Sequence, residues 1–150
     1  MHHRLTTPLP ESDFWQMFSK RASGILQWSD MDAFWAELKH TGGQWYVFDP
    51  SQDAPEMPLS GNELQVALDT AQTLVNQRRE LPMSGAVYVD NRETPTFFKV
   101  FDPANMGSSC SCSTEPVMPR YIFSQIKPDS LPFAPPPAKP GLFSRLTGRK

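Results

Sequence analysis

Two stretches in the first third of the chain repeat apolar residues at the spacing of a helix. The first, ESDFWQMFSK, carries Phe14, Trp15, Met17 and Phe18, and the second, SDMDAFWAELKHTGG, carries Met31, Phe34, Trp35 and Leu38. Positions i, i+3, i+4 and i+7 share one helical face, so both stretches are predicted helices. Ser12 or Glu11 can start the first helix, and Ser29 with Asp32 forms a capping pattern for the second. The glycine pair at 42–43 ends the second helix.

The longest helical pattern follows a capping box made by Ser60 and Glu63. Its apolar stripe consists of Leu64, Ala67, Leu68, Ala71, Leu74 and Val75. Such a sustained stripe of helical period predicts a long helix that packs against a core.

Four segments are rich in β-branched and aromatic residues, as strands are. They read QWYVFD, GAVYVD, TFFKVFD and RYIFSQI, and a short NRETP turn joins the second to the third. The order ααβαβββ predicts an α+β protein: a two-layer sandwich with a mixed four-stranded sheet and helices on one face. A helix between the first two strands predicts that they run parallel, and the tight turn makes the third antiparallel.

The tetrapeptide VFDP occurs twice, at 47–50 and at 100–103. The predicted topology places Asp49 and Asp102 at opposite edges of the sheet, which excludes a pair of catalytic carboxylates a few ångströms apart. In each copy an apolar strand ends in Asp, whose side chain can bond nearby backbone, and Pro ends the pairing. The repeat is therefore interpreted as two strand ends and not as a duplicated site.

Charge separates the chain into a body and a tail. Residues 127–150 carry five basic side chains and one acidic one, Asp129, so their net charge is +4. Because the net charge of the whole chain is −2, residues 1–126 have a net charge of −6. We expect one globular α+β domain over 1–126, whose acidic balance argues against a broad nucleic-acid surface. No apolar run is long enough to span a bilayer, and the opening residues lack a signal peptide's apolar segment, so a bacterial cytoplasmic protein is expected.

The only two cysteines, Cys110 and Cys112, form a Cys-x-Cys pair in the segment GSSCSCS. The expected topology places the end of TFFKVFD near the beginning of QWYVFD. This brings the Cys-x-Cys segment to the same sheet edge as His40, and toward Arg78 and Arg79 at the end of the long helix. Such a pair can act as a redox couple, or give two soft ligands to zinc or copper with His40 as a third. One Cys-x-Cys without a second pair is a weak signal, and ordinary loop cysteines remain the alternative.

Residues 127–150, KPDSLPFAPPPAKPGLFSRLTGRK, contain six of the sixteen prolines and end in a short apolar and basic block. We expect a disordered, stiff, Pro-rich spacer that carries a terminal interaction motif. The motif consists of Leu142, Phe143, Arg145 and Leu146. It can fold in the groove of a partner protein or touch an anionic membrane surface weakly, and a purely solubilising tail is the alternative.

No catalytic constellation stands out, and no cofactor is predicted. The favoured hypothesis is a non-enzymatic cytoplasmic adaptor or assembly factor, which binds another protein through its folded body and its tethered C-terminal peptide. The alternative is a thiol redox, metal or sulfur-handling protein that uses the Cys-x-Cys segment. The pattern of residues does not predict an oligomeric state.

Overall fold

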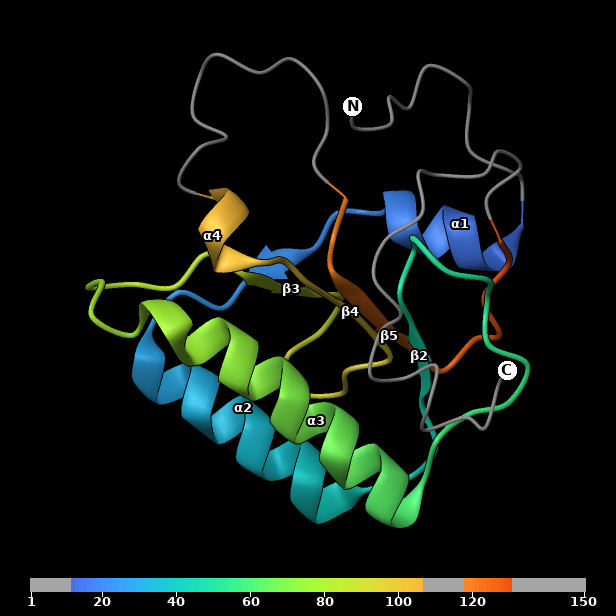
Figure 1. The fold of residues 1–150 in the computed structure, drawn as a ribbon, viewed down its shortest axis with the longest axis horizontal. Coiled ribbons are helices and arrows are strands. Elements are labelled where there is room, and N and C mark those ends of the chain that lie inside the picture. The colour runs from blue at the N-terminus through green and yellow to red at the C-terminus, as the bar shows by residue number, and fades with distance from the viewer. Residues whose placement is uncertain (1–11, 107–117, 131–150) are drawn as a thin grey trace.

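The computed structural model describes residues 12–106 and 118–130 of the chain (Figure 1). Its elements are α1 (Asp13–Ser19), β1 (Ser23–Gly24), α2 (Trp28–Thr41), β2 (Tyr46–Phe48), α3 (Gly61–Val75), the 3₁₀ turn η1 (Asn76–Arg78), β3 (Val87–Val89), β4 (Phe97–Val100), α4 (Pro103–Met106) and β5 (Tyr121–Ser124). The four predicted strands and the three predicted helices are all present, so the α+β class is confirmed.

The sheet differs from the prediction in size and in direction. It has five strands in the order β1-β3-β4-β5-β2, and every neighbouring pair is antiparallel. The predicted mixed four-stranded sheet is therefore wrong. The predicted parallel relation of β2 and β3 is wrong as well, because three antiparallel steps separate these two strands and they run in opposite directions. The predicted antiparallel relation of β2 and β4 is also wrong, because two antiparallel steps separate them and they run in the same direction.

The segment between β2 and α3 explains the change of direction. The chain turns back after β2, and Leu59 then pairs with Trp45 through two backbone hydrogen bonds of 2.8 and 3.0 Å. The loop, and not the helix, thus returns the chain to the beginning of β2. Helix α3 then runs to the other end of the sheet, where β3 begins in the opposite direction.

The fifth strand, β1, is not among the four predicted strands. Ser23 lies opposite Val89 and Gly24 opposite Tyr88. The N–H of Ile25 continues the pairing with a 3.0 Å hydrogen bond to the carbonyl of Val87. A two-residue strand has no room for a period-2 pattern, so it is recognised by its partner and not by its own sequence.

Helices cover both faces of the sheet, so the prediction of helices on one face alone is wrong. Helices α2 and α3 lie side by side over the face that carries Val87, Phe98 and Phe123 (Figure 1). On the opposite face α1 buries Phe14 and Trp15. They pack there in a second cluster with Phe48, Phe97 and Ile122.

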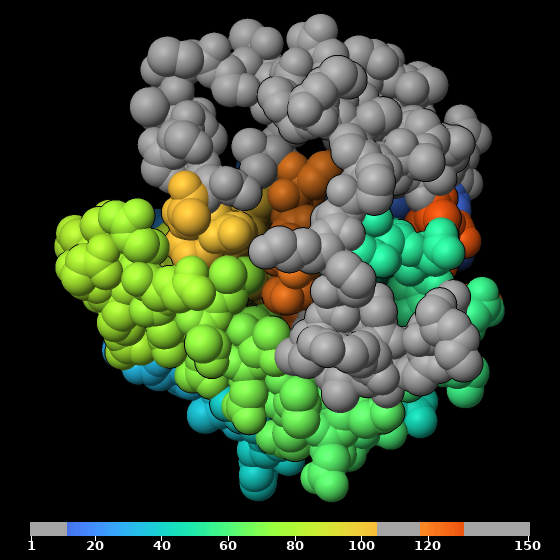
Figure 2. All heavy atoms as spheres, in the orientation of Figure 1, coloured from blue at the N-terminus to red at the C-terminus, as the bar shows by residue number. Residues whose placement is uncertain are grey.

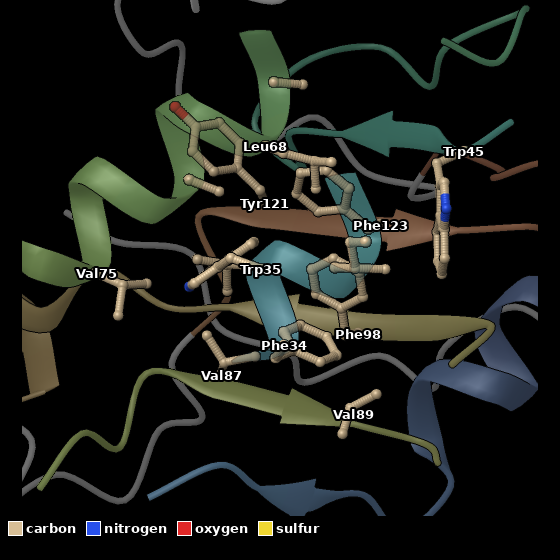
Figure 3. Close-up of a cluster of buried hydrophobic side chains, with 14 of the residues drawn as sticks. Phe34, Trp35, Trp45, Leu68, Val75, Val87, Val89, Phe98, Tyr121 and Phe123 are labelled. Atoms are coloured by element: carbon tan, nitrogen blue, oxygen red, sulfur yellow. The ribbon is translucent and has the colours of Figure 1, made fainter. Parts of the chain in front are cut away.

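Phe98 is the centre of the larger core (Figure 3). Its ring stacks on Phe123 with centroids 4.6 Å apart, and Phe34, Trp35 and Trp45 meet it edge-on at 5.1, 6.0 and 5.4 Å. Such aromatic contacts contribute roughly 0.5–1.5 kcal/mol each beyond the burial of apolar area. The predicted helical stripe of α2 is confirmed here, because Phe34 and Trp35 come from that helix.

The helix starts agree only in part with the predicted caps. Ser12 caps α1 and accepts a hydrogen bond from the N–H of Trp15, as expected. Helix α2 begins at Trp28, one residue before the predicted cap Ser29, and Gln27 precedes it without a side-chain cap bond. Ser60 stands at the predicted cap position of α3, but its side chain makes no cap bond.

Candidate functional site

Most of the predicted site residues lie outside the part of the chain that the structure describes. These are Cys110 and Cys112 of the thiol hypothesis and Leu142, Phe143, Arg145 and Leu146 of the tail motif. Their roles stay predictions.

His40 lies exposed in the last turn of α2. The neighbouring Lys39 carbonyl accepts a 3.0 Å hydrogen bond from Gln65, near the start of α3. Helix α4, from which the chain continues toward Cys110, contacts η1 at the other end of α3 (Figure 2). The expected meeting of the end of β4 with the beginning of β2 is therefore wrong. The grouping of the cysteines with His40 stays a prediction, without the shared sheet edge that motivated it.

The two VFDP copies end at the same end of the sheet, because β2 and β4 run in the same direction on either side of β5. The prediction that Asp49 and Asp102 lie at opposite edges is wrong, since β4 is an inner strand. Arg120, just before β5, donates to the buried Asp49 at 2.5 Å. Asp49 also accepts from the N–H and hydroxyl of Ser51, and Asp102 accepts from the N–H of Ala104. The interpretation of both Asp residues as strand-end caps is confirmed.

Among the described residues, three exposed apolar side chains come from segments that lie side by side at the β1 edge of the sheet. Leu26, Leu81 and Met83 have exposed fractions of 45%, 41% and 50%, and we call them the edge patch. The N–H of Ser84 donates to the Leu26 carbonyl at 2.8 Å, which holds the two segments side by side. The indole of Trp28 donates to the Leu81 carbonyl at 2.7 Å. The segments that carry the patch are therefore joined by one bond between backbone groups and one bond from a side chain to the backbone.

A cation and an aromatic ring support the patch from the side of α2. The guanidinium of Arg79 lies 4.9 Å from the ring centroid of Trp28 and donates two hydrogen bonds to Asp32, at 2.6 and 2.7 Å. These hydrogen bonds lower the pKa of Asp32 below its ordinary value. The loop after η1, which projects at the left of Figure 1, is thereby attached to the start of α2.

Next to the patch, the sheet face opposite α2 and α3 carries partly exposed side chains. Gly24, Tyr88 and Lys99 are consecutive cross-strand neighbours. The ring of Tyr88 lies so close to Gly24 that a Cβ there would be 3.1 Å from a ring carbon. Tyr88 also meets Phe101 edge-on at 5.8 Å, and the Lys99 amine lies 4.3 Å from the ring centroid of Phe18. Glycine at position 24 thus lets an aromatic ring reach the sheet edge.

The electrostatics of this region centre on Lys99. Burial lowers the pKa of the Lys99 amine. Among the described residues, no carboxylate forms an ion pair with Lys99, so no acid–base pair is assembled there. The described residues also contain no group of three or more His, Cys, Asp or Glu side chains that could hold a metal ion. None of the described helices is long and apolar enough to cross a membrane.

Comparison of the chain with models of protein families, with curated proteins and with solved structures finds no match.

The residues of the edge patch were missed in the sequence because none of them belongs to a periodic apolar pattern. Leu26 follows the buried Ile25, and Leu81 and Met83 flank Pro82. The one available signal is the pair of apolar residues around a proline, which cannot both enter a regular helix or strand.

Proposed function

We propose that this chain is a non-enzymatic cytoplasmic protein-interaction or assembly factor. Its folded body docks a partner through the edge patch, and its C-terminal peptide provides a second, tethered contact. The single observation that carries the proposal is the exposure of Leu26, Leu81 and Met83 together at a free sheet edge. Exposed apolar side chains that lie together mark interaction surfaces far more often than isolated ones do.

The size of the patch suits a small, specific contact. Full burial of a leucine or methionine side chain stabilises by roughly 1.5–3 kcal/mol, and these three are already about half buried. A partner that covers them therefore gains on the order of 1 kcal/mol from each. That gain suffices for the centre of an interface, with polar contacts around it.

Affinity capture with matched variants tests the proposal. Leu26→Asp with Met83→Asp should abolish the capture of specific partners by the full-length chain. Val66→Asp is the control, because Val66 is exposed to a similar extent, 40%, but lies on α3. Circular dichroism and the melting temperature establish that all variants fold. Capture that is equal for the patch variant and the control, with both folded, contradicts the proposal.

A further inference from the structure

The outer edge of β1 carries backbone groups that no described residue pairs. Ile25 bonds to Val87 and Ser23 lies opposite Val89, so both are turned toward β3. Bonded positions alternate along an antiparallel strand, so the N–H and carbonyl of Gly24 point away from β3. No described strand lies beyond β1 in the sheet order.

At the other edge of the sheet, the chain itself pairs with the residue just before β2. Leu59 pairs with Trp45 at the start of β2. Farther along the same connection, the N–H of Ala54 donates to the hydroxyl of Ser130 at 3.0 Å. At the β1 edge, by contrast, no described segment pairs with the outer side of the strand, so another strand can be added there.

We propose that the β1 edge binds an acidic, extended segment of a partner protein as a sixth strand. This inference rests on the proposed function and names the partner's chemistry. The pairing groups are those of Gly24, and the added strand lies beside Leu26 and the ring of Tyr88. Strand addition of this kind takes affinity from backbone hydrogen bonds and specificity from alternate side chains.

Charge favours an acidic segment. Lys20 and Arg21 are exposed and directly precede β1, and Lys99 lies on the adjoining sheet face. None of these three cations forms an ion pair with a described residue. Glu93, in the turn between β3 and β4, carries one negative charge, which is fewer than the three positive charges of these cations.

Three carboxylates of the elements next to β1 already have partners among the described residues. Asp32 of α2 is bonded by Arg79, and Asp30 pairs with Arg92 at 3.3 Å. Asp90, after β3, accepts hydrogen bonds from Thr96. The cations at the edge are therefore available to carboxylates supplied by a partner.

Side chains add a preference for an apolar or aromatic residue in the segment. Gly24 has no side chain of its own, and Leu26 lies on the same sheet face, with one methyl carbon 3.5 Å from the position of a Cβ on Gly24. A bulky residue of the added strand that points to this face meets Leu26 and Tyr88. Acidic residues before and after it meet the cations.

The same charges argue against two other occupants. The C-terminal tail carries +4 and is repelled by Lys20, Arg21 and Lys99. A second copy of the chain that paired along β1 would bring its own Lys20 and Arg21 to the same edge. Like charges brought together at a sheet edge oppose such pairing.

Peptide binding to the full-length chain tests the inference. The probe is a capped synthetic peptide in which valine and phenylalanine alternate between two pairs of glutamates. Two controls replace the glutamates by lysines, or methylate the backbone nitrogens that would pair. We expect the acidic peptide to bind and both controls to fail. Hydrogen exchange at the Gly24 amide should slow on binding, whereas that of Ile25, already bonded to Val87, should not change.

Charge reversal gives the matched protein variant. Lys20→Glu with Arg21→Glu should weaken binding of the acidic peptide by about tenfold at low salt and should favour the lysine peptide. Equal binding of the methylated peptide, or an unchanged Gly24 amide, overturns strand addition. If the Gly24 amide is already protected from hydrogen exchange without peptide, the acidic occupant is overturned. Loss of that protection on dilution then identifies a second copy of the chain as the occupant. Its loss in a chain ending at Ser130 identifies the tail instead.

The outcome is distinguishable from failure of the proposed function. In one outcome, partner capture depends on Leu26 and Met83 but not on Lys20 or Arg21, with no protection of the Gly24 amide. That result supports the proposed interaction surface and overturns the added strand.

Discussion

The buried ion pair at the ends of β2 and β5 allows a quantitative prediction. The side chain of Asp49 is 8% exposed and that of Arg120 is 35% exposed. Replacing Arg120 by Met removes the charge that faces a buried carboxylate and leaves a side chain of similar length. Replacing Asp49 by Asn removes the negative charge and leaves a guanidinium that can turn toward water.

The two single substitutions should therefore have unequal costs. Breaking a buried pair from one side costs about 3–5 kcal/mol. We expect Arg120→Met to lower the free energy of unfolding by about 2–3 kcal/mol. The cost is smaller than for a fully buried pair because Asp49 keeps its two hydrogen bonds from Ser51 and Arg120 is about one-third exposed. Loss of the guanidinium stacked 4.5 Å from the ring centroid of Tyr121 adds about 0.5–1 kcal/mol. Asp49→Asn should cost about 1 kcal/mol.

Urea unfolding of the single and double variants, followed by tryptophan fluorescence, measures these free energies. The double variant should cost less than the sum of the single ones by about 1–2 kcal/mol. Arg92→Met is the control, because Arg92 and Asp30 form a pair in which both side chains are 45% exposed, and its effect should stay within about 0.5 kcal/mol. If Arg120→Met costs no more than Asp49→Asn or the control, the reasoning from burial is refuted.

Three further predictions concern pH, the thiols and the tail. Because burial lowers the pKa of Lys99, the folded chain holds the proton of the Lys99 amine less tightly than the unfolded chain does. The free energy of unfolding should therefore rise as pH rises through the folded-state pKa, and it should level off near the unfolded value of about 10.4. Lys99→Met should remove that rise in unfolding curves measured across this range, and a rise that persists contradicts the assignment. Cys110 or Cys112 should be alkylated at neutral pH faster than a thiol of pKa about 8.5; slow alkylation of both, with no metal after purification without chelators, argues for ordinary loop cysteines. Phe143→Ala should weaken partner capture and leave the melting temperature of the body unchanged, and a lower melting temperature contradicts a tethered peptide.

Local patterns in the sequence determined the helices, the four longer strands and the hairpin between two of them. The stripes of α2 and α3 bury Trp35 and Leu64 as their spacing predicts, because helical period alone decides which residues share a face. The NRETP turn makes β3 and β4 antiparallel because so short a connection permits no other direction. The Asp residues that end the VFDP copies bond nearby backbone for an equally local reason.

Tertiary structure alone decided the direction of the strands, the face that α1 covers and the exposed edge. Leu59 reverses the expected crossover by pairing with Trp45, a contact between residues far apart in sequence that no period reveals. Ile25 is fully buried whereas its neighbour Leu26 is 45% exposed, although both are equally apolar in sequence. The physical reason is that the pattern of a segment tells which residues share a face, whereas burial depends on which other segments cover that face.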